Sequence, residues 1–154
     1  MGFTSGVVIF AKSNIEIFLS PTIWTTPSKL LGESEAQRIP NHIIVRTNFV
    51  GKKKWLYPGA FTDRFGTYLF ADKVANGIKE ICENNLQGIV HIVGDKKISM
   101  FDLAKITTSE VKPITLNDYT GPPLTIDMSL DTERWKKYKL EKWSFVYFLL
   151  KLLF

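Results

Sequence analysis

The spacing of apolar residues along the chain predicts two long helices. The stretch SKLLGESEAQRI (28–39) combines helix-forming residues with apolar positions at helical spacing. It lies between Pro27, a residue suited to a helix start, and Pro40, which cannot continue a helix. FADKVANGIKEICENN (70–85) shows a similar pattern and runs into an Asn pair typical of a helix end. We therefore expect helices over 28–39 and 70–85.

Two short apolar runs predict strands that are buried on both faces. HIIVRT (42–47) and GIVHIVGD (88–95) are rich in β-branched residues. The segment 48–68, after the first of these runs, is rich in turn residues and predicts a loop, with Gly51, Pro58, Gly59 and Gly66. Loops that follow the carboxyl end of a strand are where α/β folds build their sites.

The last third of the chain predicts shorter elements. SMFDLAKIT (99–107) reads as a helix with Ser99 as its N-cap and Asp102 in its first turn. We expect an extended segment over 111–118, a Pro-rich loop over 121–130 and an amphipathic helix over 130–140. Because strands alternate with helices, the fold class is α/β with parallel strands.

Composition places the chain among ordinary globular proteins. It has 154 residues, of which 45% are apolar and 23% charged. The single cysteine, Cys82, excludes an internal disulfide, fits a reducing cytoplasm, and lies at what we interpret as a small core position. The net charge of +5 would favour an anionic ligand, but the lysines form short separated runs without an aromatic-basic module. Nucleic acid is therefore not an expected partner, and a small nucleic-acid binder is the weakest alternative, resting on charge alone.

Neither end of the chain predicts membrane insertion. The start, MGFTSGVVIFAKSNIEIFL, lacks a basic region ahead of its apolar run, as a signal peptide would have. The end, WSFVYFLLKLLF (143–154), is interrupted by Lys151 and falls short of the roughly 20 residues of a spanning helix. We expect this tail to pack on the core or on a second subunit, with attachment to a membrane surface as the weaker alternative.

Several common site motifs are absent from the sequence. His42 and His91 lie on predicted strands without Cys, His or Asp at metal-ligand spacing, so neither predicts a metal site. We expect His42 at a strand edge and His91 half-buried with a hydrogen-bond partner. GKKK at Gly51 is not a phosphate-binding P-loop, no G-x-G-x-x-G follows an early strand, and no G-x-S-x-G occurs.

Four segments stand out in order along the chain: SKLLGESE…HIIVRTNFVG, GTYLFADKVANGIKEICEN, LQGIVHIVGDKKISMFDLAKI and PPLTIDMSLDTERWKKYKL. Together they resemble the extended short-chain dehydrogenase/reductases, and most closely the RmlD-like (dTDP-4-dehydrorhamnose reductase) family. The resemblance covers roughly 28–140 and corresponds to the C-terminal half of the family. It implies a partial Rossmann-like fold, with a parallel sheet and flanking helices, plus a small C-terminal substrate-binding part.

The resemblance also implies a domain division and a set of ligands. Residues 1–60 would be a remnant of the NAD(P)-binding Rossmann-like half. Residues 61–154 would be the substrate-binding part, with one helix returning to the Rossmann sheet. The family uses NADPH or NADH and a nucleotide sugar, here a dTDP-linked 4-keto-6-deoxy sugar. A homo-oligomer or a companion subunit is expected.

Site residues can be carried over from the family one by one. Lys29 matches the lysine of the family's catalytic Tyr-x-x-x-Lys pair, while the tyrosine position falls on Thr25. A threonine hydroxyl is a far poorer acid than a phenol, so proton donation to a ketone should be impaired. Further matches are cofactor-binding residues, namely Lys29, Arg46, Thr47 and Asn48, and substrate-binding residues, namely Phe49, Trp55 and Asp72.

Each of these residues also has a purely structural interpretation. Lys29 could be a solvated helix lysine, Arg46 could pair with a carboxylate, and Asn48 could be a turn residue. Asp72 could be a carboxylate at a helix start, where the dipole favours it, and Phe49 and Trp55 could be core residues.

The resemblance begins abruptly at Ser28. We expect the residues before Pro27 to come from an altered start, such as a truncated gene, a frameshift or a rearranged paralogue. Two functions then compete. One is a sugar-nucleotide reductase family member that is truncated and inactive alone. The other is a non-catalytic module that binds a nucleotide sugar or another subunit.

Overall fold

The computed structural model describes the backbone of residues 4–10 and 25–141, and the side chains from Lys29 to Glu141. The predicted tail contacts of 143–154 lie outside the described residues, as does most of the segment before Pro27. No helix of the described residues is long and apolar enough to cross a membrane.

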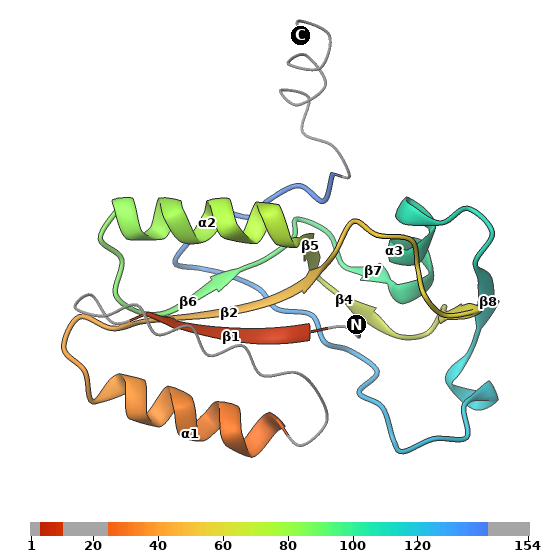
Figure 1. The fold of residues 1–154 in the computed structure, drawn as a ribbon, viewed down its shortest axis with the longest axis horizontal. Coiled ribbons are helices and arrows are strands. Elements are labelled where there is room, and N and C mark those ends of the chain that lie inside the picture. Colours follow the sequence, from red (N-terminus) through yellow and green to blue (C-terminus); the bar gives the residue numbers. More distant parts are fainter. Residues whose placement is uncertain (1–3, 11–24, 142–154) are drawn as a thin grey trace, which may run out of the picture.

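One sheet carries the larger part of the fold, and β2 (Ile43–Val50) lies at its centre (Figure 1). β6 (Gly88–Ile92) and β5 (Tyr68–Phe70) both run parallel to β2, one after the other along it. β1 (Thr4–Phe10) pairs with β2 antiparallel. The fold is therefore α/β and Rossmann-like, as predicted, and the antiparallel β1 is the departure from an all-parallel sheet.

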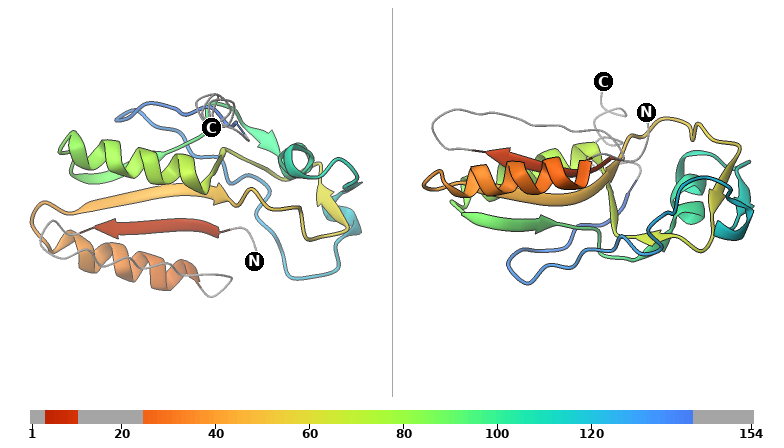
Figure 2. Two further views of the ribbon diagram at one scale, coloured as in Figure 1. Left: turned by 45° about the horizontal axis from the view of Figure 1, so that its top comes forward. Right: turned by 90° about the horizontal axis from the view of Figure 1, so that it is seen from below.

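Helices lie on both sides of this sheet. α1 (Thr25–Gln37) lies on one side and α2 (Ala71–Glu83) on the other (Figures 1 and 2). The apolar face of α2 and the sheet enclose a core in which Val45, Leu69, Ile81 and Ile92 are each completely buried. Burial of such side chains contributes about 1.5–3 kcal/mol each, so this layer stabilises the fold.

Both long helices were predicted correctly, with shifted starts. α1 begins at Thr25, so Pro27 lies in its first turn, where its missing N–H costs no hydrogen bond. α2 ends in a Schellman motif. Asn85 adopts a φ of 53°, Leu86 N donates to Ile81 O, and Asn85 N donates to Cys82 O.

A smaller group of elements packs beside the main sheet (Figure 2). β3 (Gly59–Phe61) pairs parallel with β8 (Lys112–Ile114), and β4 (Phe65–Gly66) pairs antiparallel with β7 (Ile98–Ser99). α3 (Met100–Thr107) follows β7, and a 3₁₀ turn, η1 (Leu116–Asp118), follows β8. The predicted cap of α3 is confirmed, because Ser99 Oγ accepts a hydrogen bond from Asp102 N at 3.0 Å.

The boundary between residues 60 and 61 stays a prediction. β5, α2 and β6 follow this boundary in sequence and yet belong to the main sheet layer. The predicted division places one helix of the second part on the sheet. The structure places α2 there together with two strands, β5 and β6.

Two local predictions were wrong. Residues 130–140 form no helix, because Tyr138 joins the edge of the main sheet: its N–H donates to Val93 O, and its carbonyl accepts from Asp95 N. Cys82 is exposed, since its neighbour Ile81 faces the core. The alternative interpretation of Asn48 as a turn residue is not supported, because β2 continues to Val50.

Candidate functional site

One face of α1 is turned toward the sheet and carries two charged residues at one-turn spacing. Lys29 and Glu33 are four positions apart, so they lie one above the other on the helix. Glu33 is 6% exposed and accepts two hydrogen bonds from Arg46 of β2. The distances are 2.9 Å from Nε and 2.6 Å from Nη2, which is the forked geometry that an arginine makes with a carboxylate.

The Glu33–Arg46 pair fixes the orientation of α1. It holds this face of the helix against β2, and Lys29 lies one turn before Glu33 on the same face. Burial lowers the pKa of the Lys29 ammonium below its usual value. Lys29 is therefore a half-buried amine on the sheet side of α1, and the interpretation as a fully solvated helix lysine is not supported.

The three predicted cofactor residues of β2 each have a defined environment. The hydrogen bond with Glu33 raises the pKa of the Arg46 guanidinium, and so the interpretation that Arg46 pairs with a carboxylate is confirmed. Thr47 is 2% exposed, and its Oγ1 has no hydrogen-bond partner among the described residues. Asn48 Nδ2 donates to Met128 O at 2.6 Å.

The three predicted substrate residues contact different parts of the structure. Phe49 packs against the core beneath α2. Trp55 donates from Nε1 to Gly59 O and packs against Ala60, and its ring meets Tyr57 edge-on. Asp72 lies in the first turn of α2, as predicted, and pairs with Lys52 at 2.6 Å. Their roles toward a substrate stay predictions.

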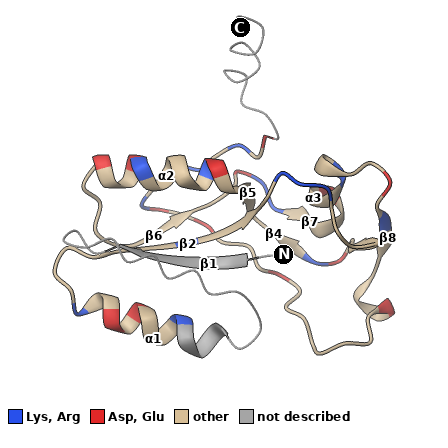
Figure 3. Cartoon of the chain, in the orientation of Figure 1, with Lys and Arg blue, Asp and Glu red and all other residues tan. Residues whose placement is uncertain are grey.

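The lysine run after β2 lies on the loop that leaves the carboxyl end of this strand (Figure 3). Lys52 is tied to Asp72, while Lys53 and Lys54 are exposed, as are Leu56 and Tyr57 further along the loop. The described histidines make backbone contacts. His42 Nδ1 lies 2.9 Å from Ile39 O, and the half-buried His91 has Nδ1 2.7 Å from Asp131 O, as expected. No group of three metal-ligating side chains occurs in the described part of the chain.

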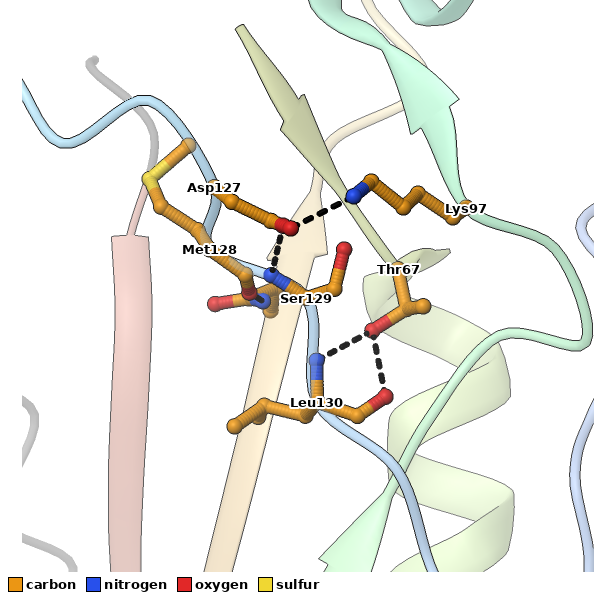
Figure 4. A network of polar contacts seen from close by, with 7 residues as sticks. Thr67, Lys97, Asp127, Met128, Ser129 and Leu130 are labelled. Carbon is orange, nitrogen blue, oxygen red and sulfur yellow. Dashed lines mark hydrogen bonds and ion pairs between the residues drawn. The ribbon is translucent and has the colours of Figure 1, made fainter.

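A polar network links Lys97, just before β7, with Thr67, after β4, and with the segment 127–130 (Figure 4). Lys97 Nζ contacts Asp127 Oδ2. The other carboxylate oxygen, Asp127 Oδ1, accepts a hydrogen bond from Ser129 N at 2.9 Å. Thr67 Oγ1 donates to Leu130 O and accepts from Leu130 N, at 3.0 and 2.9 Å. Together with the bond from Asn48 to Met128, these contacts bring the segment 127–130 to the end of β2.

Sequence reasoning missed this network. The segment 122–140 resembles the reductase family in sequence, but no motif distinguishes its partners Thr67 and Lys97. Neither residue has a distinctive spacing, and their contacts join positions 63 and 30 residues apart. The family resemblance points to the segment that contains residues 127–130, but its contacts with Thr67 and Lys97 follow only from the fold.

Solved structures of dTDP-4-dehydrorhamnose reductases share the fold of this chain. The reductase from Bacillus anthracis str. Ames, in complex with NADP, matches with a TM-score of 0.65 and 16% identity, over 86% of this chain and 57% of that chain. The enzyme from Yersinia enterocolitica matches with a TM-score of 0.59 and 19% identity, over 81% and 55%. A hypothetical reductase from Sulfolobus tokodaii matches with a TM-score of 0.55 and 26% identity, over 80% and 51%.

The chain has the fold of the RmlD-like reductases. It spans about half the length of the relatives that it matches. No family model matches the sequence, and no curated protein matches it either. The RmlD-like fold was thus predicted correctly from the four sequence segments, and it accounts for a sheet flanked by α1 and α2.

Proposed function

We propose that this chain is a partial member of the NAD(P)-dependent sugar-nucleotide reductases, with no turnover of its own. The observation that carries the proposal is the RmlD-like fold, in which a half-buried Lys29 occupies the sheet side of α1. A lysine there fits the family's Tyr-x-x-x-Lys pair, in which the cation lowers the pKa of the tyrosine.

The chemistry of the remaining residues argues against catalysis. In the family's reaction a hydride passes from the nicotinamide to a 4-keto sugar while a phenol supplies the proton. Thr25 stands at the position of that phenol, and an aliphatic hydroxyl does not supply a proton near neutral pH. Tyr68 is no substitute, because it is 2% exposed and burial raises its pKa to about 12.

The cofactor residues carried over from the family are also engaged within the chain. Arg46 is held by Glu33, Asn48 is held by Met128, and Thr47 is almost fully buried. A dinucleotide would have to displace these contacts. We therefore propose that the chain does not bind NADPH or NADH tightly when it is alone.

The activity assay is oxidation of NADPH in the presence of a dTDP-linked 4-keto-6-deoxy sugar. We expect no rate above the background without protein. A rate that scales with protein concentration and disappears in Lys29→Met would overturn the proposal. The Lys79→Met variant is the control, since Lys79 is an exposed helix lysine on α2.

The second candidate function is a non-catalytic module that binds a nucleotide sugar or another subunit. A specific feature favours it. β1 pairs only with β2 among the described residues, and α1 beside it exposes Leu30 at 59% and Leu31 at 63%. Paired apolar side chains next to a sheet edge are typical of contacts between subunits.

A further inference from the structure

The loop that follows β2 combines lysines with exposed apolar side chains. Its sequence, GKKKWLYPG (51–59), contains no acidic residue, and we call these residues the lysine loop. Lys53 and Lys54 are exposed. Leu56 is 67% exposed and Tyr57 is 51% exposed. Single apolar side chains are normal on a protein surface, but adjacent ones beside charged residues indicate a contact site.

The lysine loop is anchored to α3 through its tryptophan. Trp55 N donates to Thr108 Oγ1 at 2.8 Å, and Trp55 Nε1 donates to Gly59 O at 3.0 Å. The Trp55 ring packs against the small core cluster that includes Ala104, and it meets the ring of Tyr57 edge-on with centroids 5.8 Å apart. Because Trp55 occupies this small core, the two residues after it remain at the surface.

Further exposed lysines flank the lysine loop. Lys112 of β8 donates from its N–H to Pro58 O at 3.3 Å, and Lys105 lies on α3. Figure 3 shows the lysine loop, α3 and β8 at the same end of the molecule. The adjoining segment 105–114 contains one carboxylate, Glu110. This end of the molecule is therefore cationic around the exposed apolar side chains.

An anionic lipid surface matches this combination of side chains. Lysine ammonium groups are attracted to acidic headgroups, and leucine and tyrosine side chains favour the boundary between headgroups and acyl chains. A single-stranded nucleic acid would also attract the lysines, but it binds by stacking its bases on aromatic faces. The most exposed large apolar side chain of the lysine loop is Leu56, which has no such face.

We propose that the lysine loop binds the surface of membranes that contain anionic lipids. Lys53 and Lys54 contact the headgroups, while Leu56 and Tyr57 enter the boundary between headgroups and acyl chains. The anchored Trp55 holds these side chains in place, so little conformational freedom is lost on binding. The proposal goes beyond the proposed function and does not rest on it.

The test is cosedimentation of the full chain with phosphatidylcholine vesicles that contain or lack phosphatidylserine. We expect binding to the vesicles that contain phosphatidylserine, and binding that is about tenfold weaker or less to the others, because the attraction of the lysines is lost. Raising the salt concentration from about 0.05 M to about 0.5 M should release the wild-type chain, since salt screens exposed charges.

A pair of lysine substitutions assigns the attraction to the lysine loop. We expect Lys53→Gln/Lys54→Gln to weaken binding to the anionic vesicles by about tenfold or more. Lys79→Gln/Lys139→Gln is the matched control, because it removes the same charge from two exposed lysines in other segments. The control should bind within about twofold of the wild type, since charges beyond the screening length contribute little.

A leucine substitution assigns the apolar part of the contact. We expect Leu56→Ser to weaken binding by about threefold or more, because one apolar side chain no longer enters the lipid. Ile126→Ser is the control, since Ile126 is 61% exposed and lies in the Pro-rich loop. It should bind as the wild type does. Far-UV circular dichroism checks that each variant is folded.

Three results would each overturn the proposal. The first is the absence of wild-type binding to the anionic vesicles, or equal binding to both kinds of vesicle. The second is equal binding by the wild type and the two loop variants. The third is capture of a single-stranded oligonucleotide that depends on Lys53 and Lys54 without any binding to vesicles. None of these results changes the proposed function, which is tested by turnover and by cofactor binding.

Discussion

Glu33 is the one charged residue that is buried in the described part of the chain, and its partner Arg46 is only partly exposed. A buried carboxylate without a partner is strongly unfavourable, so Glu33 and Arg46 depend on each other. The consequence is that α1, and Lys29 with it, has a fixed orientation on the sheet.

We therefore expect Glu33→Gln to lower the free energy of unfolding by about 1–2 kcal/mol, since a charge-assisted pair becomes a neutral one. Urea denaturation measures the change. Glu35→Gln is the control: Glu35 pairs with Arg38 on the surface, with 55% and 74% of these side chains exposed. Its effect should stay within about 0.5 kcal/mol. Equal losses in the two variants would contradict the role given to Glu33.

Asp127 gives the residue network of Figure 4 a dependence on pH. Lys97, with a smaller contribution from Ser129, lowers the pKa of this carboxyl from 3.8 to about 2. A depressed pKa adds stability above the unfolded value and loses it as the pH falls through the folded value. Stability from this contact is thus complete above about pH 4 and disappears toward pH 2.

The stability difference between the wild type and Asp127→Asn should therefore shrink as the pH is lowered from about 4 to about 2. Lys97→Met should remove the same dependence, because it removes the first cause of the shift. Denaturant midpoints across this pH range measure both. If the stability difference between the wild type and Asp127→Asn stays constant over this pH range, the ion pair between Lys97 and Asp127 does not form in solution.

At the level of the elements, the end of α2 requires a residue at position 85 that tolerates a left-handed backbone conformation. Asn85 adopts a φ of 53°, a left-handed conformation that costs a residue with an ordinary Cβ roughly 1–2 kcal/mol. We expect Asn85→Ala to be destabilising by about 1 kcal/mol and Asn85→Gly to be neutral or slightly stabilising. Thermal unfolding of the two variants checks the order. A reversed order would mean that the Schellman motif is absent.

The elements that were predicted from the sequence share a strong local pattern. The helices over 28–39 and 70–85, the strands and the cap at Ser99 each follow from periodicity or from turn chemistry. The segment 130–140 has a helical pattern as well, but its aromatic residues Trp135 and Tyr138 pack against the core under α2 and Tyr138 hydrogen-bonds the sheet edge. Tertiary contacts overrode the local preference there.

The candidate site was less predictable than the fold for a related reason. Lys29 and Arg46 were found because each belongs to a recognisable segment. The partner of Arg46 was not found, because Glu33 looks like any helix carboxylate in sequence.

At the level of the whole molecule, the chain spans about half the length of the reductases whose fold it shares. We propose that copies of the chain associate through the side of α1 and β1. Light scattering after gel filtration should give a mass above that of the 17.6 kDa chain. Replacing Leu30 and Leu31 together by Ser should lower this mass, because both side chains are apolar and exposed.

Leu56→Ser is the control for this experiment, since Leu56 is as exposed, at 67%, but lies on the loop after β2. It should leave the mass unchanged. A wild-type monomer at high protein concentration would rule out the association.

The central claim combines the RmlD-like fold of the chain with our proposal that the chain alone does not turn over a sugar nucleotide. Paired titrations of the wild-type chain with dTDP-rhamnose and with NADPH test it most directly. The account predicts binding of the sugar nucleotide and none of the cofactor. Binding of NADPH, accompanied by its oxidation when a 4-keto sugar nucleotide is added, would contradict it.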